Sequence, residues 1–171
     1  FWDAPRIADK PGLKAVDLFR AIEEGKVKAV WIMATNPVVS LPDADQVRRA
    51  LQRCELVVVS DMSADTDTAA LGHVLLPALG WGEKDGTVTN SERCISRQRA
   101  FLPGPGEARS DWQAICQVAQ RMGFHGFDYA GVHAIFDEHA RLSGWRNTEG
   151  ELPRALRIDG LAGICLLYTS D

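Results

Sequence analysis

The pattern of apolar and polar positions predicts an α/β fold in the first half of the chain. Two segments, 12–25 and 43–53, carry apolar side chains at helical spacing and predict amphipathic helices. Three short apolar runs between and after them predict strands: 27–33, 56–59 and 73–76. The first two of these runs are almost continuous, which is typical of strands buried on both faces of a parallel sheet. We therefore expect a Rossmann-like parallel sheet flanked by helices, with a right-handed crossover between its first two strands.

The second half is less regular. Residues 80–98 contain glycines, charges and an alternating Thr-Val-Thr stretch, and this predicts a long ordered loop or a hairpin. A helix is predicted over 111–122, preceded by Ser110 as its cap and followed by Gly123 at the position where helices end. Another helix is predicted over 130–142, after which the periodicity fades.

Composition and charge narrow the class of partners. The 171 residues are 46% hydrophobic and 25% charged, as in an ordinary globular domain, and the net charge is −4. We therefore expect no general attraction to nucleic acid or to an anionic membrane surface. No apolar run approaches the roughly 18–20 residues of a membrane span, and the first ten residues are too polar for a secretory signal.

Cysteine spacing and motif searches exclude several kinds of site within this chain. The four cysteines are too far apart for a Cys-x-x-Cys pair, so we expect neither a zinc nor an iron–sulfur site here, but reduced thiols in a reducing compartment: Cys54, Cys94, Cys116 and Cys165. The sequence also contains no Walker loop and no Gly-x-Gly-x-x-Gly turn, which argues against an ordinary dinucleotide-binding Rossmann domain.

Polar residues follow two of the predicted strands. Asn36 comes after the first, and Ser60 and Asp61 end the second. Ligands of open α/β sheets bind beyond the carboxyl ends of the strands, where an amide, a hydroxyl and a carboxylate can bind a base or a diphosphate. The alternative is that Asn36 and Asp61 merely close turns, as Asn and Asp often do.

Two further candidates have weaker support from the residues alone. Lys84 could pair with a phosphate or a ring carbonyl, although a lone lysine beside acids is more often solvated. Asp111 follows Ser110 at a helix start, where an acid also complements the helix dipole.

An ordered series of segments resembles one enzyme family. The segments are Trp31-Ile-Met-Ala-Thr-Asn-Pro37, Val58-Val-Ser-Asp61, Thr66-Asp-Thr-Ala69, His73-Val-Leu-Leu-Pro77, Trp81-Gly-Glu-Lys-Asp-Gly-Thr-Val-Thr-Asn90 and Pro105-Gly-Glu-Ala-Arg-Ser-Asp111. Together they resemble the molybdenum oxidoreductases that bind two molybdopterin guanine dinucleotides. The flanks Lys10–Phe19 and Asn90–Arg93 are most similar to assimilatory nitrate reductases, whose catalytic subunit reduces nitrate to nitrite in the cytoplasm.

The resemblance implies a role for each candidate residue. It assigns cofactor contacts to Asn36, Ser60, Asp61, Lys84 and Asp111. It implies that the chain holds one guanine dinucleotide arm of a molybdenum bis(molybdopterin guanine dinucleotide). Neither a catalytic residue nor a metal ligand is expected here. The iron–sulfur cluster would be held elsewhere in the full-length protein and reduced by an electron-donor protein or domain, with nitrate as the substrate of the whole enzyme. The fragment alone is not expected to turn over.

Two alternatives remain open at this point. The same domain occurs in sister enzymes, such as periplasmic nitrate reductase or formate dehydrogenase. A non-catalytic relative in a respiratory-complex subunit would keep the domain for structure only, but the joint presence of Asn36, Ser60, Asp61 and Lys84 argues against it.

The sequence departs from the family pattern at two places. Cys94 stands where the family commonly has a second arginine, which removes a charge contact. The end Cys165–Asp171 matches one frame of a common sequencing-library transposon end, and Phe1 is not an initiator methionine. We therefore expect residues 1–142 to be an internal fragment of the cofactor-binding domain, 143–164 to begin a following segment, and 165–171 to be a non-native read-through tail.

Overall fold

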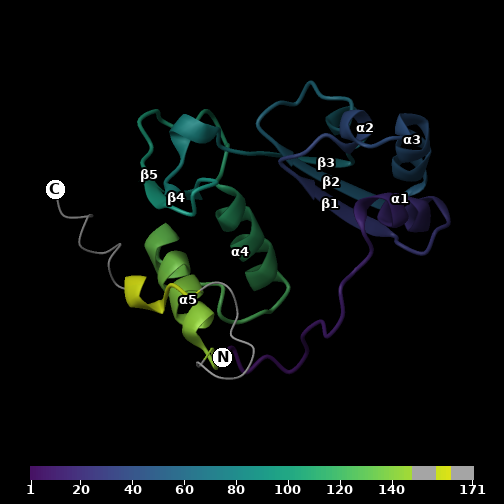
Figure 1. Cartoon of the computed structure of the whole chain (residues 1–171). Coiled ribbons are helices and arrows are strands. Elements are labelled where there is room, and N and C mark those ends of the chain that lie inside the picture. Colours follow the sequence, from purple (N-terminus) through teal and green to yellow (C-terminus); the bar gives the residue numbers. More distant parts are fainter. Residues whose placement is uncertain (148–156, 163–171) are drawn as a thin grey trace. The chain divides into compact units, whose positions relative to one another are not determined.

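The computed structural model describes residues 1–147 and 157–162 and divides into two compact units (Figure 1). The sheet unit consists of Ile7–Glu83 and Phe101–Ala114. The hairpin unit consists of Phe1–Arg6, Lys84–Ala100 and the described residues from Ile115 onward. Residues 165–171 and part of 143–164 lie outside the described ranges, so the expectations for them stay predictions.

The sheet unit is built on three parallel strands. They are β1 (Ala29–Met33), β2 (Leu56–Asp61) and β3 (Val74–Pro77), in the order β1-β2-β3. Ala29 pairs with Leu56 at the start of the sheet, and Asp61 pairs with Pro77 at its end. The predicted α/β class with a parallel sheet is confirmed, and each strand starts within two residues of its predicted position.

Helices follow the pattern of the sequence with one addition. The helix α1 (Ala15–Glu23) begins three residues later than predicted, because Lys14 is extended. The helix α3 (Ala44–Arg53) begins after Asp43, whose side chain accepts a hydrogen bond from the Gln46 N–H at 2.9 Å, a regular helix cap. The short helix α2 (Pro37–Ser40), which the pattern did not predict, lies between β1 and α3.

A single apolar core joins these helices to the sheet. The helices α1 and α3 pack against each other, and α2 contacts α3. Their inner faces meet one face of the sheet around the buried residues Phe19, Ile22, Ile32, Val38, Val47, Ala50, Leu51, Cys54, Val57, Val59 and Ala69. The core therefore holds β1 and β2 rigidly and sets the positions of the residues that follow them.

The expectation that β1 and β2 are buried on both faces is wrong for the described residues. Val57 and Val59 are buried, but Leu56 is exposed and Val58 is only half-buried. The reason lies in the connections. The β1–β2 crossover contains α2 and α3, whereas the β2–β3 connection contains only the 3-10 turn η1 (Ala69–Leu71) and supplies no helix for the second face.

The hairpin unit confirms the hairpin that was one of two predictions for 80–98. The strands β4 (Gly86–Thr89) and β5 (Ile95–Gln98) pair antiparallel, preceded by the 3-10 turn η2 (Trp81–Glu83) of the sheet unit. In the connecting loop Arg93 has a φ of 65°, and its N–H donates to the Asn90 carbonyl at 3.0 Å. This geometry is typical of a three-residue hairpin loop.

Two longer helices follow in the described part of the chain. The helix α4 (Asp111–Arg121) is followed closely by Gly123, whose φ of 84° confirms the predicted stop. The helix α5 (Val132–Gly144) is followed by the 3-10 turn η3 (Asp159–Leu161). Within the described ranges, none of the helices has the length and apolar character that crossing a bilayer requires.

Candidate functional site

The carboxyl ends of the three parallel strands meet at one edge of the sheet. Asn36 follows β1, Asp61 ends β2, and Pro77 ends β3 directly beside Asp61. The strands bring these ends together because they are parallel and in register. The sequence prediction that polar residues gather at this edge is therefore supported by the fold.

A hollow of 320 Å³ lies at this edge. We call it the edge hollow, and it is lined by residues of β2, β3, η1 and the turn after β2: Val59, Asp61, Met62, Ser63, Ala64, Ala69, Leu75, Leu76 and Pro77. Its walls are mainly apolar, and Asp61 supplies their carboxylate. A flat ring with N–H groups on one edge is the kind of ligand that such a lining accommodates.

Asp61 closes its own turn and still presents a carboxylate oxygen. Its Oδ1 accepts the backbone N–H of Ser63 at 3.2 Å, so the turn-closing role considered from the sequence is confirmed. Among the described residues, no hydrogen bond to Oδ2 is found. Asp61 is half-buried, so this oxygen can accept hydrogen bonds from a ligand.

The side chain of Ser60 does not lie on the same face of the sheet as that of Asp61. Because side chains alternate along a strand, Ser60 and Asp61 point to opposite faces of the sheet. Ser60 is 2% exposed, and its hydroxyl accepts the indole N–H of Trp31 at 2.8 Å. Ser60 is not among the residues that line the edge hollow, and its side chain holds Trp31 in place on the other face.

Asn36 is held by a residue that the sequence did not single out. The Thr68 hydroxyl donates to Asn36 Oδ1 at 2.6 Å. Thr68 is fully buried, directly before Ala69 of the edge hollow. The sequence shows a threonine directly before the apolar run Ala69–Leu71, but a threonine in that position is usually a packing residue.

The tertiary structure brings Asp111 to the same edge. Arg109 pairs with Ala78, in parallel, and donates its N–H to the Pro77 carbonyl at 3.0 Å. The chain thereby adds a short parallel stretch beside the end of β3, and Asp111 follows it as the first residue of α4. Fifty residues of sequence separate Asp61 from Asp111, so this placement rests on pairing that the local pattern does not contain.

Lys84 belongs to the hairpin unit, apart from the other four candidates. Its backbone carbonyl accepts a hydrogen bond from Gln98 Nε2 at 3.2 Å, which ties the lysine to the end of β5. This hydrogen bond holds the backbone of Lys84 in place within its own unit.

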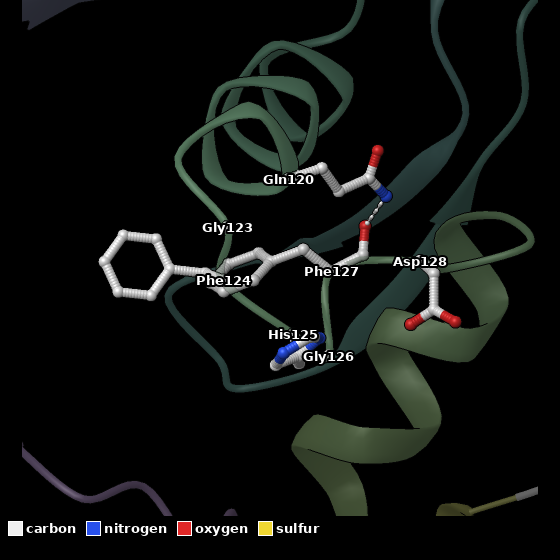
Figure 2. A pocket seen from close by; sticks show the side chains of 7 residues that line it. All are labelled: Gln120, Gly123, Phe124, His125, Gly126, Phe127 and Asp128. Carbon is white, nitrogen blue, oxygen red and sulfur yellow. Dashed lines mark hydrogen bonds between the residues drawn. The ribbon is translucent and has the colours of Figure 1, made fainter.

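A second hollow lies in the loop after α4 (Figure 2). It measures 430 Å³ and is lined by Gln120, Gly123, Phe124, His125, Gly126, Phe127 and Asp128. The dashed line in Figure 2 is the hydrogen bond from Gln120 Nε2 to the Phe127 carbonyl, at 2.7 Å. The amide thus closes the loop on itself. His125 lies in this loop between Gly123 and Gly126.

In the part of the chain that the structure describes, no cluster of three or more histidine, cysteine, aspartate or glutamate side chains is placed to hold a metal ion.

Comparison with known proteins decides the family. The family model described as Molybdopterin oxidoreductase matches residues 4–121. The chain belongs to this family. Among its relatives in the molybdopterin oxidoreductase family, a nitrate reductase of Klebsiella oxytoca is 58% identical over 165 residues, which are 96% of this chain and 19% of that protein. The F420-dependent formate dehydrogenase subunit alpha of Methanocaldococcus jannaschii is 40% identical over 146 residues, 84% of this chain and 21% of that protein.

A solved structure supports the molybdopterin oxidoreductase fold. Acetylene hydratase from Pelobacter acetylenicus matches with a TM-score of 0.62 and 25% identity, over 71% of this chain and 18% of that one. The chain thus spans about a fifth of the length of the relatives it matches. The resemblance inferred from the ordered segments is confirmed at the level of the family.

Proposed function

We propose that this chain is part of a molybdenum-dependent nitrate reductase, and that its sheet unit holds one guanine dinucleotide arm of the cofactor. The identity of 58% to a nitrate reductase over almost the whole chain supports the substrate. The family supports an oxidoreductase with a molybdenum–pterin cofactor. The proposal for the guanine arm rests on the edge hollow and on Asp61.

The Asp61 carboxylate is the observation that carries the proposal. Guanine presents two adjacent N–H donors on one edge, and a carboxylate accepts such a pair well. No hydrogen bond to Asp61 Oδ2 is found among the described residues, and the apolar residues beside it, Val59 and Leu75, can pack against a ring. The residues present therefore fit the guanine end of the cofactor.

The remaining candidates take supporting roles in the proposal. Asn36 and Asp111 lie at the same sheet edge as Asp61, where they can contact the nucleotide. Lys84 belongs to the other unit, and its proposed contact with a phosphate or a ring carbonyl rests on the family resemblance alone. Ser60 is proposed to act indirectly. Its hydrogen bond with Trp31 helps to hold the end of β2, where Asp61 lies.

The cofactor, when bound, supplies the oxidation–reduction chemistry, and the residues of this chain bind and orient it. We also propose that the complete enzyme receives electrons from a donor protein or domain through an iron–sulfur cluster held elsewhere. Its proposed role is nitrate assimilation in the cytoplasm. A second candidate function, formate oxidation, is favoured by the 40% identity to a formate dehydrogenase subunit.

Asp61→Asn in the complete enzyme tests the proposal. The change replaces a charged oxygen, which accepts a hydrogen bond from a guanine N–H, by an amide N–H, which cannot accept one. A hydrogen bond to a charged group contributes about 1.5–3 kcal/mol, so we expect roughly tenfold to hundredfold weaker binding of the dinucleotide arm. Guanosine monophosphate released by acid hydrolysis measures cofactor content, beside nitrate kinetics. Content should fall, while KM for nitrate in the loaded molecules stays unchanged.

Asp65→Asn is the matched control. Asp65 lies on the same turn, is exposed and does not line the edge hollow. It should keep full cofactor content. A normal cofactor content in the Asp61 variant, or a raised KM for nitrate with the cofactor intact, would refute the proposed role. Nitrate reduction and formate oxidation by the same preparation decide between the two candidate activities.

A further inference from the structure

Thr68 connects two segments that are distant in the sequence. Its hydroxyl oxygen accepts the backbone N–H of Val38 at 3.3 Å and donates to Asn36 Oδ1 at 2.6 Å. Thirty residues separate Thr68 from Val38, and 32 separate it from Asn36. Thr68 and Val38 are buried, whereas Asn36 is half-buried at the sheet edge. The contact therefore reaches from the core to the candidate site.

Asn36 occupies a capping position without performing the capping role. An asparagine directly before a helix usually accepts an N–H of the first helical turn with its own side chain. Asn36 precedes α2 but makes no such bond. Thr68 accepts the Val38 N–H in its place, so the Asn36 side chain is released from the helix and bonded to Thr68 instead.

The donors and acceptors fix which end of the amide meets Thr68. A backbone N–H can only donate, so the Thr68 oxygen accepts from Val38, and its single hydrogen must find another acceptor. Asn36 Oδ1 is that acceptor. An amide turned the other way would leave a buried hydroxyl hydrogen without an acceptor, which is destabilising. Asn36 Nδ2 is consequently the end turned away from Thr68.

We propose that Thr68 is a positioning residue that turns the Asn36 amide so that its N–H groups donate to an acceptor oxygen of the bound guanine nucleotide. The inference rests on the proposed function, since it names the chemistry of one contact in that site. The acceptor is either a phosphate oxygen or the guanine carbonyl, which share the same requirement for a donor. Asn36 thus donates, while Asp61 accepts.

The first test removes or restores the Thr68 hydroxyl in the complete enzyme, prepared without cofactor. Thr68→Val should weaken binding of guanosine diphosphate, measured by calorimetry, by about tenfold. Thr68→Ser, which keeps the hydroxyl, should bind within about threefold of the unchanged enzyme. Thr66→Val is the matched control, because Thr66 also bonds a backbone N–H, that of Ala69 at 3.0 Å, without touching Asn36. Equal weakening in both valine variants would overturn the inference.

The second test inverts the polarity of the amide. Asn36→Asp keeps the acceptor for the Thr68 hydroxyl but replaces the N–H groups by a charged oxygen. A ligand that needs a donor should bind to this variant at least about tenfold more weakly than to Asn36→Ala, because an acceptor facing an acceptor repels. If Asn36 served only to receive the Thr68 hydroxyl, the order would reverse. The reversed order overturns the inference.

Two ligands distinguish the source of the acceptor oxygen. If Asn36→Asp weakens guanosine diphosphate but not guanosine, the acceptor is a phosphate oxygen, and if it weakens both, the acceptor is the guanine carbonyl. Failure of the inference differs from failure of the proposed function. In the first case the unchanged enzyme binds guanosine diphosphate and Asp61→Asn weakens it, while Thr68→Val and Asn36→Asp do not. In the second case the unchanged enzyme does not bind it.

Discussion

The sheet unit and the hairpin unit differ in what fills their interiors. The sheet unit buries a continuous apolar core between one face of the sheet and three helices. In the hairpin unit, the apolar residues buried among those described are small, Cys116, Ala119 and Ala140, and the polar Asp137, Ser143 and Asn147 are buried beside them. Two large apolar residues, Ile115 of α4 and Met122 directly after it, are exposed.

The difference concerns how each unit is held together. Ser143 Oγ donates to the Ala140 carbonyl at 2.6 Å and accepts the Ile158 N–H at 2.8 Å, and Asn147 Nδ2 donates to the Ser143 carbonyl at 2.9 Å. Hydrogen bonds of this kind each contribute only about 1 kcal/mol net, whereas burying one large aliphatic side chain contributes about 1.5–3 kcal/mol. The sheet unit is therefore the one built to hold ligand-binding side chains in fixed positions.

The largest expected effect comes from the core. Leu51 is 0% exposed, and Leu51→Ala should lower the free energy of unfolding by about 2–5 kcal/mol, through lost burial and the cavity left behind. Ile115, at 41% exposure, is the matched position in α4, and Ile115→Ala should lower it by less than about 1 kcal/mol. Urea unfolding followed by circular dichroism measures both. Equal losses would show that the two interiors contribute alike.

A second effect tests the hairpin unit through pH. Burial, followed by the hydrogen bond to Glu138 and the charge of that carboxylate, raises the pKa of Tyr129 to about 12. Tyrosine in the unfolded chain ionises near its ordinary value of 10.0, so above that pH the folded state holds more protons than the unfolded state. Stability should consequently fall as pH rises from about 10 to about 12, and should be unaffected by Tyr129 below this window.

Tyr129→Phe should remove this alkaline loss of stability. The chain has two tyrosines, so the ultraviolet titration of tyrosinate should also lose its high-pKa step in the variant. A wild-type titration with both steps near the ordinary value would contradict the half-buried contact between Tyr129 and Glu138.

The smallest effect compares backbone strain in the two units. Ala34 (φ 53°) in the sheet unit and Arg93 (φ 65°) in the hairpin unit both adopt the left-handed conformation that favours glycine. Replacing either by Gly removes about 1–2 kcal/mol of strain, offset by about 0.5–1 kcal/mol of extra chain entropy in the unfolded state. We expect Ala34→Gly to raise the unfolding midpoint slightly, and Arg93→Gly to slow amide hydrogen exchange within the hairpin alone. A midpoint shift in both variants would show that the hairpin unfolds together with the core.

The local sequence pattern correctly predicted the features that depend only on residues close together in the chain. The strands and helices follow from side-chain periodicity, and their ends follow from residues such as Asp43 and Gly123 that act within one turn. Asn36 and Asp61 could be placed at one sheet edge because parallel strands in register bring their carboxyl ends together. The family itself followed from the ordered motifs.

Only the tertiary structure decided three other features. Arg109 pairs beside β3 and brings Asp111 to the edge, Thr68 reaches Asn36 across 32 residues, and the β2–β3 connection leaves the second face of the sheet without a helix. Each depends on which distant segments pack side by side. Periodicity reports how a segment faces its surroundings, but not which partner those surroundings contain.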